Sequence, residues 1–461
     1  MMIKTKEFPR FMICAPSSGS GKTLITCALL RILTRHGYLP ASFKCGPDYI
    51  DPMFHKKVLG IPSRNLDVFF MGSFDVKKAL CRGSEGRNIG VLEGVMGLFD
   101  GMSADSSEGS SIDIAGITGT PAILVVNCKG MSRSVIPLVK GFCDYDREKL
   151  IRGVILNNIS PMIADTIKKE IEEETGIPVI GLLPAMKDVN FSSRHLGLVM
   201  PDEVPQVLET IDRVADKLEE NLDLDKLLEI AGDAKKILAL KNFGISEKDI
   251  PSTSGKKIRI GVAVDEAFCF YYQDNFDLLK ELGAEIVPFS PINDSRLPEV
   301  SGLIFGGGYP ELYAKALSEN ISMRKKILDA AENGTPILAE CGGFLYLQEK
   351  MTDPEGNTYD MVGALSGQSH MKDRLGHFGY VTMEADKPCP YLKELESIKA
   401  HEFHYYDTTD NGDACILKKP SGRFWSGYQV RGNVFGGFAH LYYPSCPGLI
   451  KRFLECTTLS H

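Results

Sequence analysis

Short apolar runs alternate with helical patterns through the first half of the chain. Residues 11–15 form an apolar run that predicts a buried strand, and residues 23–36 predict the helix that follows it. Further apolar runs predict buried strands at residues 89–92, 122–127 and 153–157. Strands that alternate with helices in this way are typical of a parallel sheet covered by helices on both faces. We therefore expect an α/β fold here.

The alternation is interrupted once and then starts again. Residues 202–242 have a charged helical pattern, and residues 246–257, rich in Ser, Lys, Pro and Gly, are predicted to be a linker. Beyond it, short strands are predicted at residues 258–264, 286–289, 302–305 and 336–339. A chain of 461 residues has room for two or three domains of about 100–200 residues. We predict two α/β domains, residues 1–245 and 258–461.

Composition and charge narrow the class of protein. Hydrophobic residues make up 43% and charged residues 24%, as in ordinary globular proteins. The net charge of −8 and the lack of a basic block argue against a nucleic-acid partner. No apolar stretch approaches the roughly 20 residues of a membrane span, and the 12 cysteines show no paired spacing. We expect a cytoplasmic protein with reduced thiols and no membrane partner.

A glycine-rich loop joins the first predicted strand to the first predicted helix. Its residues 15–23 read Ala-Pro-Ser-Ser-Gly-Ser-Gly-Lys-Thr. Backbone N–H groups of such a loop can surround phosphate oxygens, Lys22 can reach the β- and γ-phosphates, and the Thr23 hydroxyl can bind Mg²⁺. Pro16 stands where the strict motif has glycine, and a Gly/Ser turn that only opens a helix is the alternative. The predicted ATP-binding residues are Ser18, Gly19, Ser20, Gly21, Lys22, Thr23 and Asn157.

Acidic residues follow two of the predicted strands. Asp48 and Asp51 lie in the run 46–52, at one predicted strand end, and Glu93 follows the strand at 89–92. Open α/β sheets bind ligands beyond the carboxyl ends of their strands, and Mg²⁺ usually takes one or two carboxylates plus phosphates and waters. We predict Thr23, Asp48 and Glu93 as the metal ligands; acids that only cap their loops are the alternative.

One cysteine has a catalytic context. Cys341 follows the strand at 336–339 and precedes Gly342 and Gly343, which is the pattern of a nucleophile elbow. A thiol nucleophile needs a base, and the residues alone leave His401, His404 and His440 open. The run at 401–404 is not the zinc motif HExxH, because its second histidine comes one residue too early.

Three glycines, 306–308, follow the strand at 302–305. They could bring a backbone N–H to a developing oxyanion, because glycine lets the main chain approach a substrate closely. A tight turn without a catalytic role explains the same glycines.

Together these motifs resemble the cobyrinate a,c-diamide synthases of cobalamin biosynthesis and their near relatives. The resemblance spans nearly the whole chain and is carried by residues 43–55, 65–67, 93–101, 194–198, 305–311, 339–345 and 401–405. It implies a P-loop domain similar to dethiobiotin synthetase, followed by a class I glutamine amidotransferase domain of the cobyric-acid-synthase type.

The resemblance also implies a ligase mechanism. Cys341 would release ammonia from L-glutamine with His440 as its base, and N–H groups of Gly308 and Gly342 would hold the oxyanion. Tyr442 stands where the usual class I enzyme has a glutamate, which leaves open what orients His440; Glu402 is a candidate. ATP would convert a substrate carboxylate into an acyl phosphate, which ammonia converts into an amide.

The implied substrate is cobyrinate, amidated at its c and then its a acetate side chain. The residues predicted to face this anionic macrocycle are Lys44, Tyr49, Asp51, Arg194 and His195, although a structural salt bridge explains an arginine equally well. Hydrogenobyrinate and nickel-sirohydrochlorin are alternative substrates. An ATPase switch without amide chemistry is an alternative of another class, but it would need neither the cysteine elbow nor a second α/β domain.

Overall fold

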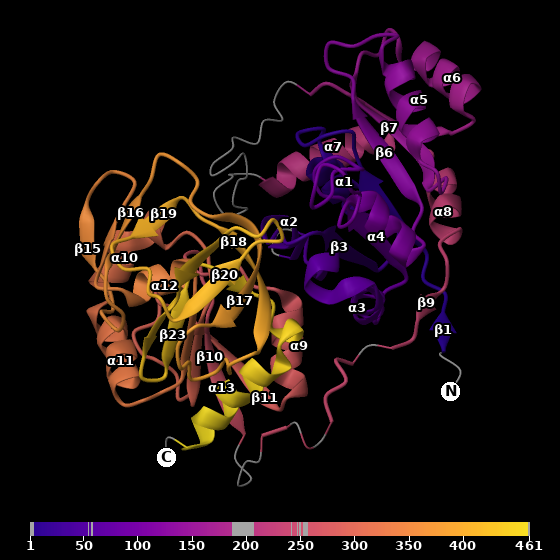
Figure 1. Ribbon diagram of the computed structural model, residues 1–461. Helices are drawn as coiled ribbons and strands as arrows, with labels where there is room; N and C mark the ends of the chain where they lie inside the picture. Colours follow the sequence, from indigo (N-terminus) through magenta and orange to yellow (C-terminus); the bar gives the residue numbers. More distant parts are fainter. Residues whose placement is uncertain are drawn as a thin grey trace. The chain divides into compact units, whose positions relative to one another are not determined.

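The computed structural model describes residues 4–53, 55–56, 59–186, 207–240, 242–246, 248, 250–251 and 257–459. The chain forms two units, Met1–Lys241 and Asn242–His461, each built around its own sheet (Figure 1). The predicted linker at 246–257 lies largely outside the described residues. No helix in the described part is both long and apolar enough to cross a membrane.

A seven-stranded sheet forms the centre of the first unit, with strand order β4-β3-β5-β2-β6-β7-β8. Every neighbouring pair is parallel. The strands are β2 (Arg10–Cys14), β3 (Pro40–Cys45), β4 (Ser63–Leu66), β5 (Ile89–Glu93), β6 (Ala122–Asn127), β7 (Ile151–Ile159) and β8 (Val179–Pro184). Nearly all of their side chains are buried, as expected for a sheet covered on both faces. The predicted parallel α/β fold is confirmed.

Helices cover the two faces of this sheet in two groups. One hydrophobic core joins the sheet to α1 (Lys22–Arg35), α7 (Val207–Glu219) and α8 (Leu224–Gly232). The other core contains residues of α3 (Val68–Gly83), α4 (Ser111–Thr118), α5 (Val135–Tyr145) and α6 (Ala164–Thr175). The charged pattern predicted after residue 202 therefore belongs, where it is described, to the cover of the first sheet.

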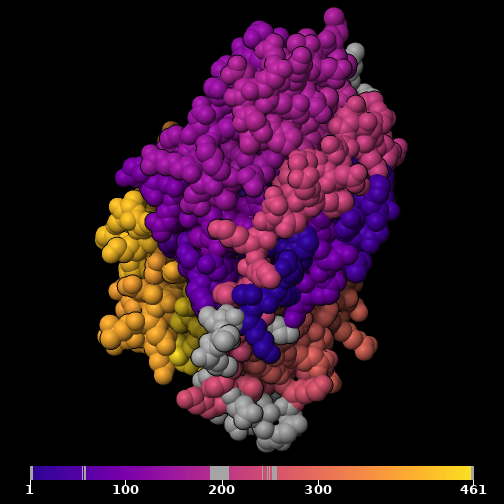
Figure 2. Space-filling view, turned by 90° about the vertical axis from the view of Figure 1, so that its right-hand side faces the viewer, coloured from indigo at the N-terminus to yellow at the C-terminus, as the bar shows by residue number. Residues whose placement is uncertain are grey.

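The N-terminal part of the first unit contacts its C-terminal part at two places. Strand β1 (Thr5–Lys6) pairs antiparallel with β9 (Ile237–Leu238). Helix α7 lies along α1, with Arg31 Nε 2.6 Å from Asp212 Oδ1. Figure 2 shows this surface, where the indigo N-terminal segment and the pink end of the unit lie side by side. Residues about 200 apart in the chain therefore belong to one folding unit.

The second unit has a six-stranded sheet in the order β11-β10-β12-β13-β23-β22. Its strands are β10 (Ile258–Ala263), β11 (Ala284–Phe289), β12 (Gly302–Phe305), β13 (Ile337–Glu340), β22 (Gln429–Arg431) and β23 (Val434–Gly437). All pairs are parallel except β22 with β23. One core contains residues of α9 (Gln273–Glu281) and α13 (Pro447–Leu459), and another contains α10 (Ala314–Glu319), α11 (Ile321–Glu332) and α12 (Gly342–Leu347).

Two further sheets complete this unit, and the sequence pattern predicts neither. The larger, in the order β21-β20-β17-β18-β24, is antiparallel throughout. Its strands are β17 (Phe378–Ala385), β18 (Ser397–Phe403), β20 (Cys415–Lys418), β21 (Phe424–Gly427) and β24 (His440–Leu441). The smaller contains β14 (Lys350–Thr352), β15 (Thr358–Asp360), β16 (Gln368–Met371) and β19 (Tyr406–Thr408). The larger sheet contains His440, a candidate catalytic base, as the first residue of β24.

Candidate active sites

The phosphate loop connects β2 to α1 and is braced from the side by β7. Gly19 and Gly21 have φ values of 76° and 94°, in the left-handed region that favours glycine. Asn157 in β7 donates from Nδ2 to the Ser20 carbonyl at 2.9 Å, and the Ser20 hydroxyl donates to the Ser17 carbonyl at 2.9 Å. The structure therefore places Asn157 behind the loop, where it supports the loop's backbone.

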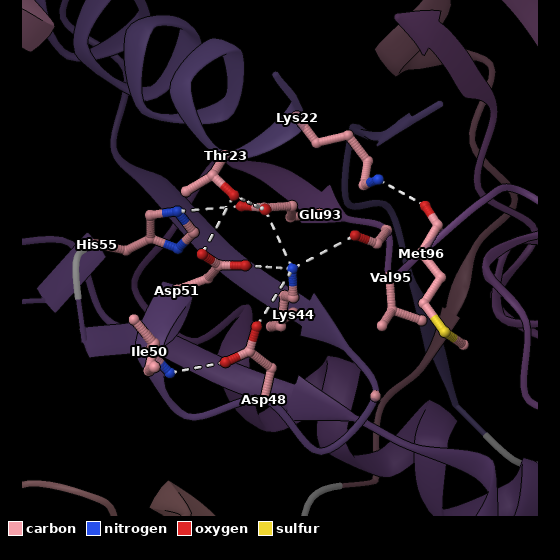
Figure 3. A network of polar contacts seen from close by, with 12 residues as sticks. Lys22, Thr23, Lys44, Asp48, Ile50, Asp51, His55, Glu93, Val95 and Met96 are labelled. Atoms are coloured by element: carbon pink, nitrogen blue, oxygen red, sulfur yellow. Dashed lines mark hydrogen bonds and ion pairs between the residues drawn. The ribbon is translucent and has the colours of Figure 1, made fainter. Parts of the chain in front are cut away.

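Lys22 is held against the same loop. Its Nζ donates to the Met96 carbonyl at 2.5 Å and to the Ser17 carbonyl at 3.2 Å (Figure 3). Burial lowers the pKa of Lys22, and the nearby cation of Lys44 lowers it further. A buried ammonium group of this kind gains strongly from an anionic partner, which is the chemistry expected of a phosphate-binding lysine.

An acidic cluster adjoins the start of α1. The Thr23 hydroxyl lies 2.7 Å from Glu93 Oε1, to which it donates, and 3.2 Å from Asp51 Oδ1 (Figure 3). Asp48 lies differently, since its Oδ1 accepts a hydrogen bond from the Ile50 N–H at 2.9 Å. The structure thus brings Thr23, Glu93 and Asp51 together, whereas Asp48 caps the start of α2 (Ile50–Met53). The assignment of Asp48 as a metal ligand stays a prediction, and Asp51 joins it as a candidate.

Lys44 lies at the centre of these carboxylates. Its Nζ forms an ion pair with Asp51, lies 3.1 Å from Glu93 Oε1, and lies 3.8 Å from Asp48 Oδ2. Burial disfavours the charge, but the attraction of Asp51 and Glu93 outweighs it and raises the pKa of Lys44 above its ordinary value. The lysine therefore remains a cation and offsets the carboxylates.

The two buried carboxyl groups differ in charge. Burial opposes ionisation of Glu93, but Lys44 and His55 outweigh it and hold its pKa well below the usual range. Burial and the neighbouring Glu93 together raise the pKa of Asp51. The negative charge of the pair therefore resides mainly on Glu93.

The donor set fits Mg²⁺. Glu93 is fully buried, yet its Oε2 has no hydrogen bond in the described part of the chain and lies 3.5 Å from His55 Nε2. Carboxylate and hydroxyl oxygens are the hard ligands that this ion prefers. The described residues contain no group of three or more His, Cys, Asp and Glu side chains arranged to hold a metal by themselves. A magnesium ion here would depend on nucleotide phosphates and water for its other ligands.

The residues predicted to face the substrate are only partly described. Lys44 and Asp51 belong to the acidic cluster, and Tyr49 is buried beside it in the loop after β3. Arg194 and His195 lie outside the described residues.

In the second unit, Cys341 lies on a sharp turn between β13 and α12. Its backbone has φ 48° and ψ −108°, which a non-glycine residue rarely adopts. The Cys341 N–H donates to the Gly437 carbonyl at 2.8 Å, and the Leu345 N–H donates to the Cys341 carbonyl at 3.0 Å. The turn and its strain are those of a nucleophile elbow.

Three neighbouring parallel strands bring the predicted catalytic residues together. Strands β12, β13 and β23 are adjacent, and they end before Gly306, Cys341 and Phe438 respectively. A Cβ atom built on Gly342 would lie 3.2 Å from the Gly308 nitrogen. A Cβ atom built on Gly307 would overlap the His440 ring and lie 3.1 Å from its Nε2. The glycine loop, the elbow and the histidine therefore converge, and their catalytic roles remain predictions.

Cys341 and His440 are both buried, with 8% and 2% exposure, and burial disfavours the charged form of each. Burial lowers the pKa of His440 to about 3, and the neighbouring His401 and His404 add to the effect. Burial raises the pKa of the Cys341 thiol, and the charge of Glu311 raises it further. A neutral imidazole beside a thiol can accept the thiol proton when the sulfur attacks.

The other two histidines of the sequence analysis have different neighbours. His401 lies directly opposite His440 in the β18–β24 pair. His404 Nε2 lies 2.9 Å from Glu402 Oε1, and the His404 ring stacks on Phe438 with centroids 3.8 Å apart. Glu402 therefore pairs with His404.

A tyrosine that sequence reasoning missed supports the glycine loop. The Gly306 N–H donates to the Tyr271 hydroxyl at 2.9 Å, and that hydroxyl donates to the Ala263 carbonyl. Tyr271 lies 35 residues from Gly306, and no spacing rule links the two. Only the packing of β10 beside β12 reveals the contact.

The two units match two family models. Residues 11–199 match the CobQ/CobB/MinD/ParA nucleotide binding domain, and residues 259–446 match the CobB/CobQ-like glutamine amidotransferase domain. The fold and the sites thus define a nucleotide-binding glutamine amidotransferase, and the predicted fold class is confirmed.

Curated relatives match along nearly the whole chain. A cobyrinate a,c-diamide synthase of Listeria innocua is 40% identical over 450 residues, which cover 96% of this chain and 98% of the relative. Proteins of the same name from Caldanaerobacter subterraneus and Methanosarcina acetivorans are 37% and 39% identical, covering 96% and 95% of this chain and 97% and 93% of theirs. The chain belongs to the cobyrinate a,c-diamide synthase family, and the resemblance seen in the sequence is confirmed.

Proposed function

We propose that this protein is a glutamine-hydrolysing carbon–nitrogen ligase that uses ATP to convert the a and c acetate groups of cobyrinate into amides. One observation carries the proposal: a single chain of this family holds both the Cys341 elbow, next to the glycine loop against which His440 packs, and the phosphate loop with its Thr23–Glu93 contact. The first arrangement can release ammonia, and the second can activate a carboxylate.

In the glutaminase half-reaction, Cys341 Sγ attacks the side-chain amide carbon of glutamine while His440 accepts the thiol proton. The tetrahedral oxyanion receives hydrogen bonds from the Gly308 and Gly342 N–H groups, and each such donor is typically worth about 2.7–4 kcal/mol. His440 passes the proton to the departing ammonia, which leaves a thioester on Cys341. Water then attacks the thioester and releases glutamate.

In the synthetase half-reaction, a substrate carboxylate oxygen attacks the γ-phosphorus of ATP, and ADP leaves. Ammonia attacks the resulting acyl phosphate, phosphate departs, and an amide remains. The loop at 18–23 binds and places the phosphates, with Lys22 as its cation. Thr23, Glu93 and either Asp51 or Asp48 would hold Mg²⁺, which supplies positive charge to the phosphates when bound. Two rounds, at the c and then the a position, produce the diamide.

The contacts of the first unit separate the predicted substrate residues into one that balances charge and others that can contact the substrate. Lys44 is already surrounded by Asp48, Asp51 and Glu93, which favours a role in charge balance. We propose that Tyr49, Arg194 and His195 contact the tetrapyrrole acid. None of the 12 cysteines, all of which lie in the described part of the chain, forms a disulfide, which supports a reducing, cytoplasmic location.

Mass spectrometry of the products tests this function. The purified protein is incubated with ATP, Mg²⁺ and glutamine together with cobyrinate, hydrogenobyrinate or nickel-sirohydrochlorin. Two new amides on cobyrinate are expected. Amides formed only on another acid would change the substrate, and ATP hydrolysis without any amide would favour an ATPase switch.

A further inference from the structure

The residue that stands where class I glutaminases usually carry a glutamate has another partner here. Tyr442 follows His440 by two residues, and its hydroxyl donates to Asp274 Oδ2 at 2.7 Å. Glu402, the other candidate to orient His440, pairs with His404. Tyr442 and Glu402 thus form hydrogen bonds with Asp274 and His404.

Hydrogen bonds hold the backbone on both sides of His440. On the N-terminal side, the Tyr428 hydroxyl donates to the Ala439 carbonyl at 2.6 Å. On the C-terminal side, Asn275 Nδ2 donates to the Leu441 carbonyl at 2.8 Å. Asn275 Oδ1 also accepts from the Tyr443 N–H at 2.9 Å, and because that N–H can only donate, it determines which way the amide points.

Both side chains are buried and come from separate elements. Tyr428 is 1% exposed and Asn275, in α9, is 5% exposed. Tyr428 adopts φ 70°, a value that a non-glycine residue rarely takes and that persists only where the surrounding structure enforces it. Its ring lies against Gly437, where any Cβ atom would overlap it. In this backbone conformation the Tyr428 hydroxyl reaches the carbonyl of Ala439, the residue before His440.

We infer that Tyr428 and Asn275 are positioning residues that hold His440 in place at the glutaminase site through the backbone on either side of it. The inference rests on the proposed glutaminase chemistry. A displacement of about 1 Å in a reacting group can cost about 100-fold in rate, so hydrogen bonds to the flanking peptides can control catalysis without touching the substrate.

Alkylation of Cys341 tests the inference without any tetrapyrrole. Tyr428→Phe removes one hydroxyl, and Asn275→Asp keeps the acceptor for Tyr443 while removing the donor to Leu441. Tyr391→Phe is the matched control, because the buried Tyr391 hydroxyl also donates to a backbone carbonyl, that of Asn433. Labelling by iodoacetamide is followed at Cys341 by peptide mass spectrometry between pH 6 and 9, alongside glutamate release and ammonium-driven amide formation.

We expect Tyr428→Phe and Asn275→Asp to slow labelling of Cys341 at neutral pH and glutamine-driven turnover by about tenfold or more, the scale of a weakened general base. Ammonium-driven amide formation should be unchanged, and Tyr391→Phe should match the unaltered protein in all assays. Wild-type labelling in both variants, or equal loss of glutamine- and ammonium-driven rates, would overturn the inference. An unaltered protein that labels at Cys341 and releases glutamate but forms no amide would refute the proposed ligase while leaving the positioning role intact.

Discussion

The Thr23 hydroxyl donates to Glu93 Oε1 at 2.7 Å and so joins the start of α1 to the end of β5. The two residues lie 70 positions apart in the chain, but β2 and β5 are neighbours in the sheet, and their carboxyl ends meet at one edge. This contact places a hydroxyl and a charged carboxylate beside the phosphate loop. The proposed ATP-dependent activation of the substrate rests on this geometry.

Removing the charge of Glu93 should disable the synthetase half. Glu93→Gln keeps the size of the side chain but weakens the proposed metal site, and we expect ADP release and amide formation to fall by about 10- to 100-fold or more. Cys341 labelling should continue, because it belongs to the other unit. Thr23→Ser, which keeps a hydroxyl, is the control and should retain much of the activity. Normal turnover by Glu93→Gln at limiting Mg²⁺ would show that Glu93 is no metal ligand.

Lys22→Ala should abolish amide formation with either nitrogen source. The lysine is the cation of the phosphate loop, and without it neither glutamine nor ammonium can react with an activated carboxylate. Product mass spectra with each nitrogen source measure this. Undiminished synthesis by the variant would remove the loop from the mechanism.

Cys341→Ala should separate the two half-reactions. Glutamine-driven synthesis should be lost, because no thioester can form, whereas added ammonium salts should still support amide formation. Rates with glutamine and with ammonium are compared on the same preparation. If a folded variant fails with ammonium too, the division of labour between two sites is wrong.

Gly307→Ala should disrupt the glutaminase site. The added methyl group would overlap the His440 ring, so the imidazole must move away from Cys341. We expect glutamate release to fall by about 100-fold, with ammonium-driven synthesis retained. Gly427→Ala is a matched control, since its methyl group meets only the Leu417 side chain, at 3.1 Å. Equal rates for the two variants would place His440 outside the reaction.

Acid should destabilise the second unit through its buried histidines. Burial lowers the pKa values of both His401 and His440 to about 3, whereas an unfolded histidine titrates near its ordinary value of about 6.5. Between these values the unfolded chain binds more protons than the folded one, so the free energy of unfolding rises with pH. The stability that the two neutral histidines contribute is present above about pH 6.5 and is lost as the pH falls towards 3.

Denaturant titrations from pH 4 to 8 measure this effect. The free energy of unfolding should fall most steeply below about pH 6.5, and His401→Asn should flatten the slope. Substitution of the exposed His370 by Asn should leave it unchanged. A pH-independent free energy of unfolding would mean that these histidines are not held neutral.

The sequence predicted the elements that carry a clear hydrophobic pattern. The buried strands β2, β5, β6 and β7 and the helix α1 were all predicted, because a fully covered parallel strand is a continuous apolar run. The antiparallel strands from β17 to β21 were not predicted, because exposed and partly exposed positions interrupt the continuous apolar runs that revealed the parallel strands.

The acidic cluster beside Thr23 shows that the tertiary structure distinguishes two similar carboxylates. Asp48, in the loop after β3, and Asp51, in α2, both offer a carboxylate, and the sequence favoured Asp48 as the metal ligand. In the structure Asp48 caps α2 through the Ile50 N–H, and the following turn directs Asp51 to Thr23. Because Asp48 lies before this short helix and Asp51 within it, the start of α2 decides which acid faces the hydroxyl, and no spacing rule contains that information.

By itself, the sequence determined the two α/β units, the phosphate loop, the cysteine elbow and the family, because each depends on residues that are close together in the chain. Only the tertiary structure decided which acid contacts Thr23 and which histidine pairs with Glu402. It also decided that Tyr428 and Asn275 donate hydrogen bonds to the backbone on either side of His440. These contacts join residues brought together by strand order and helix packing, and their energies exist only once the cores have formed.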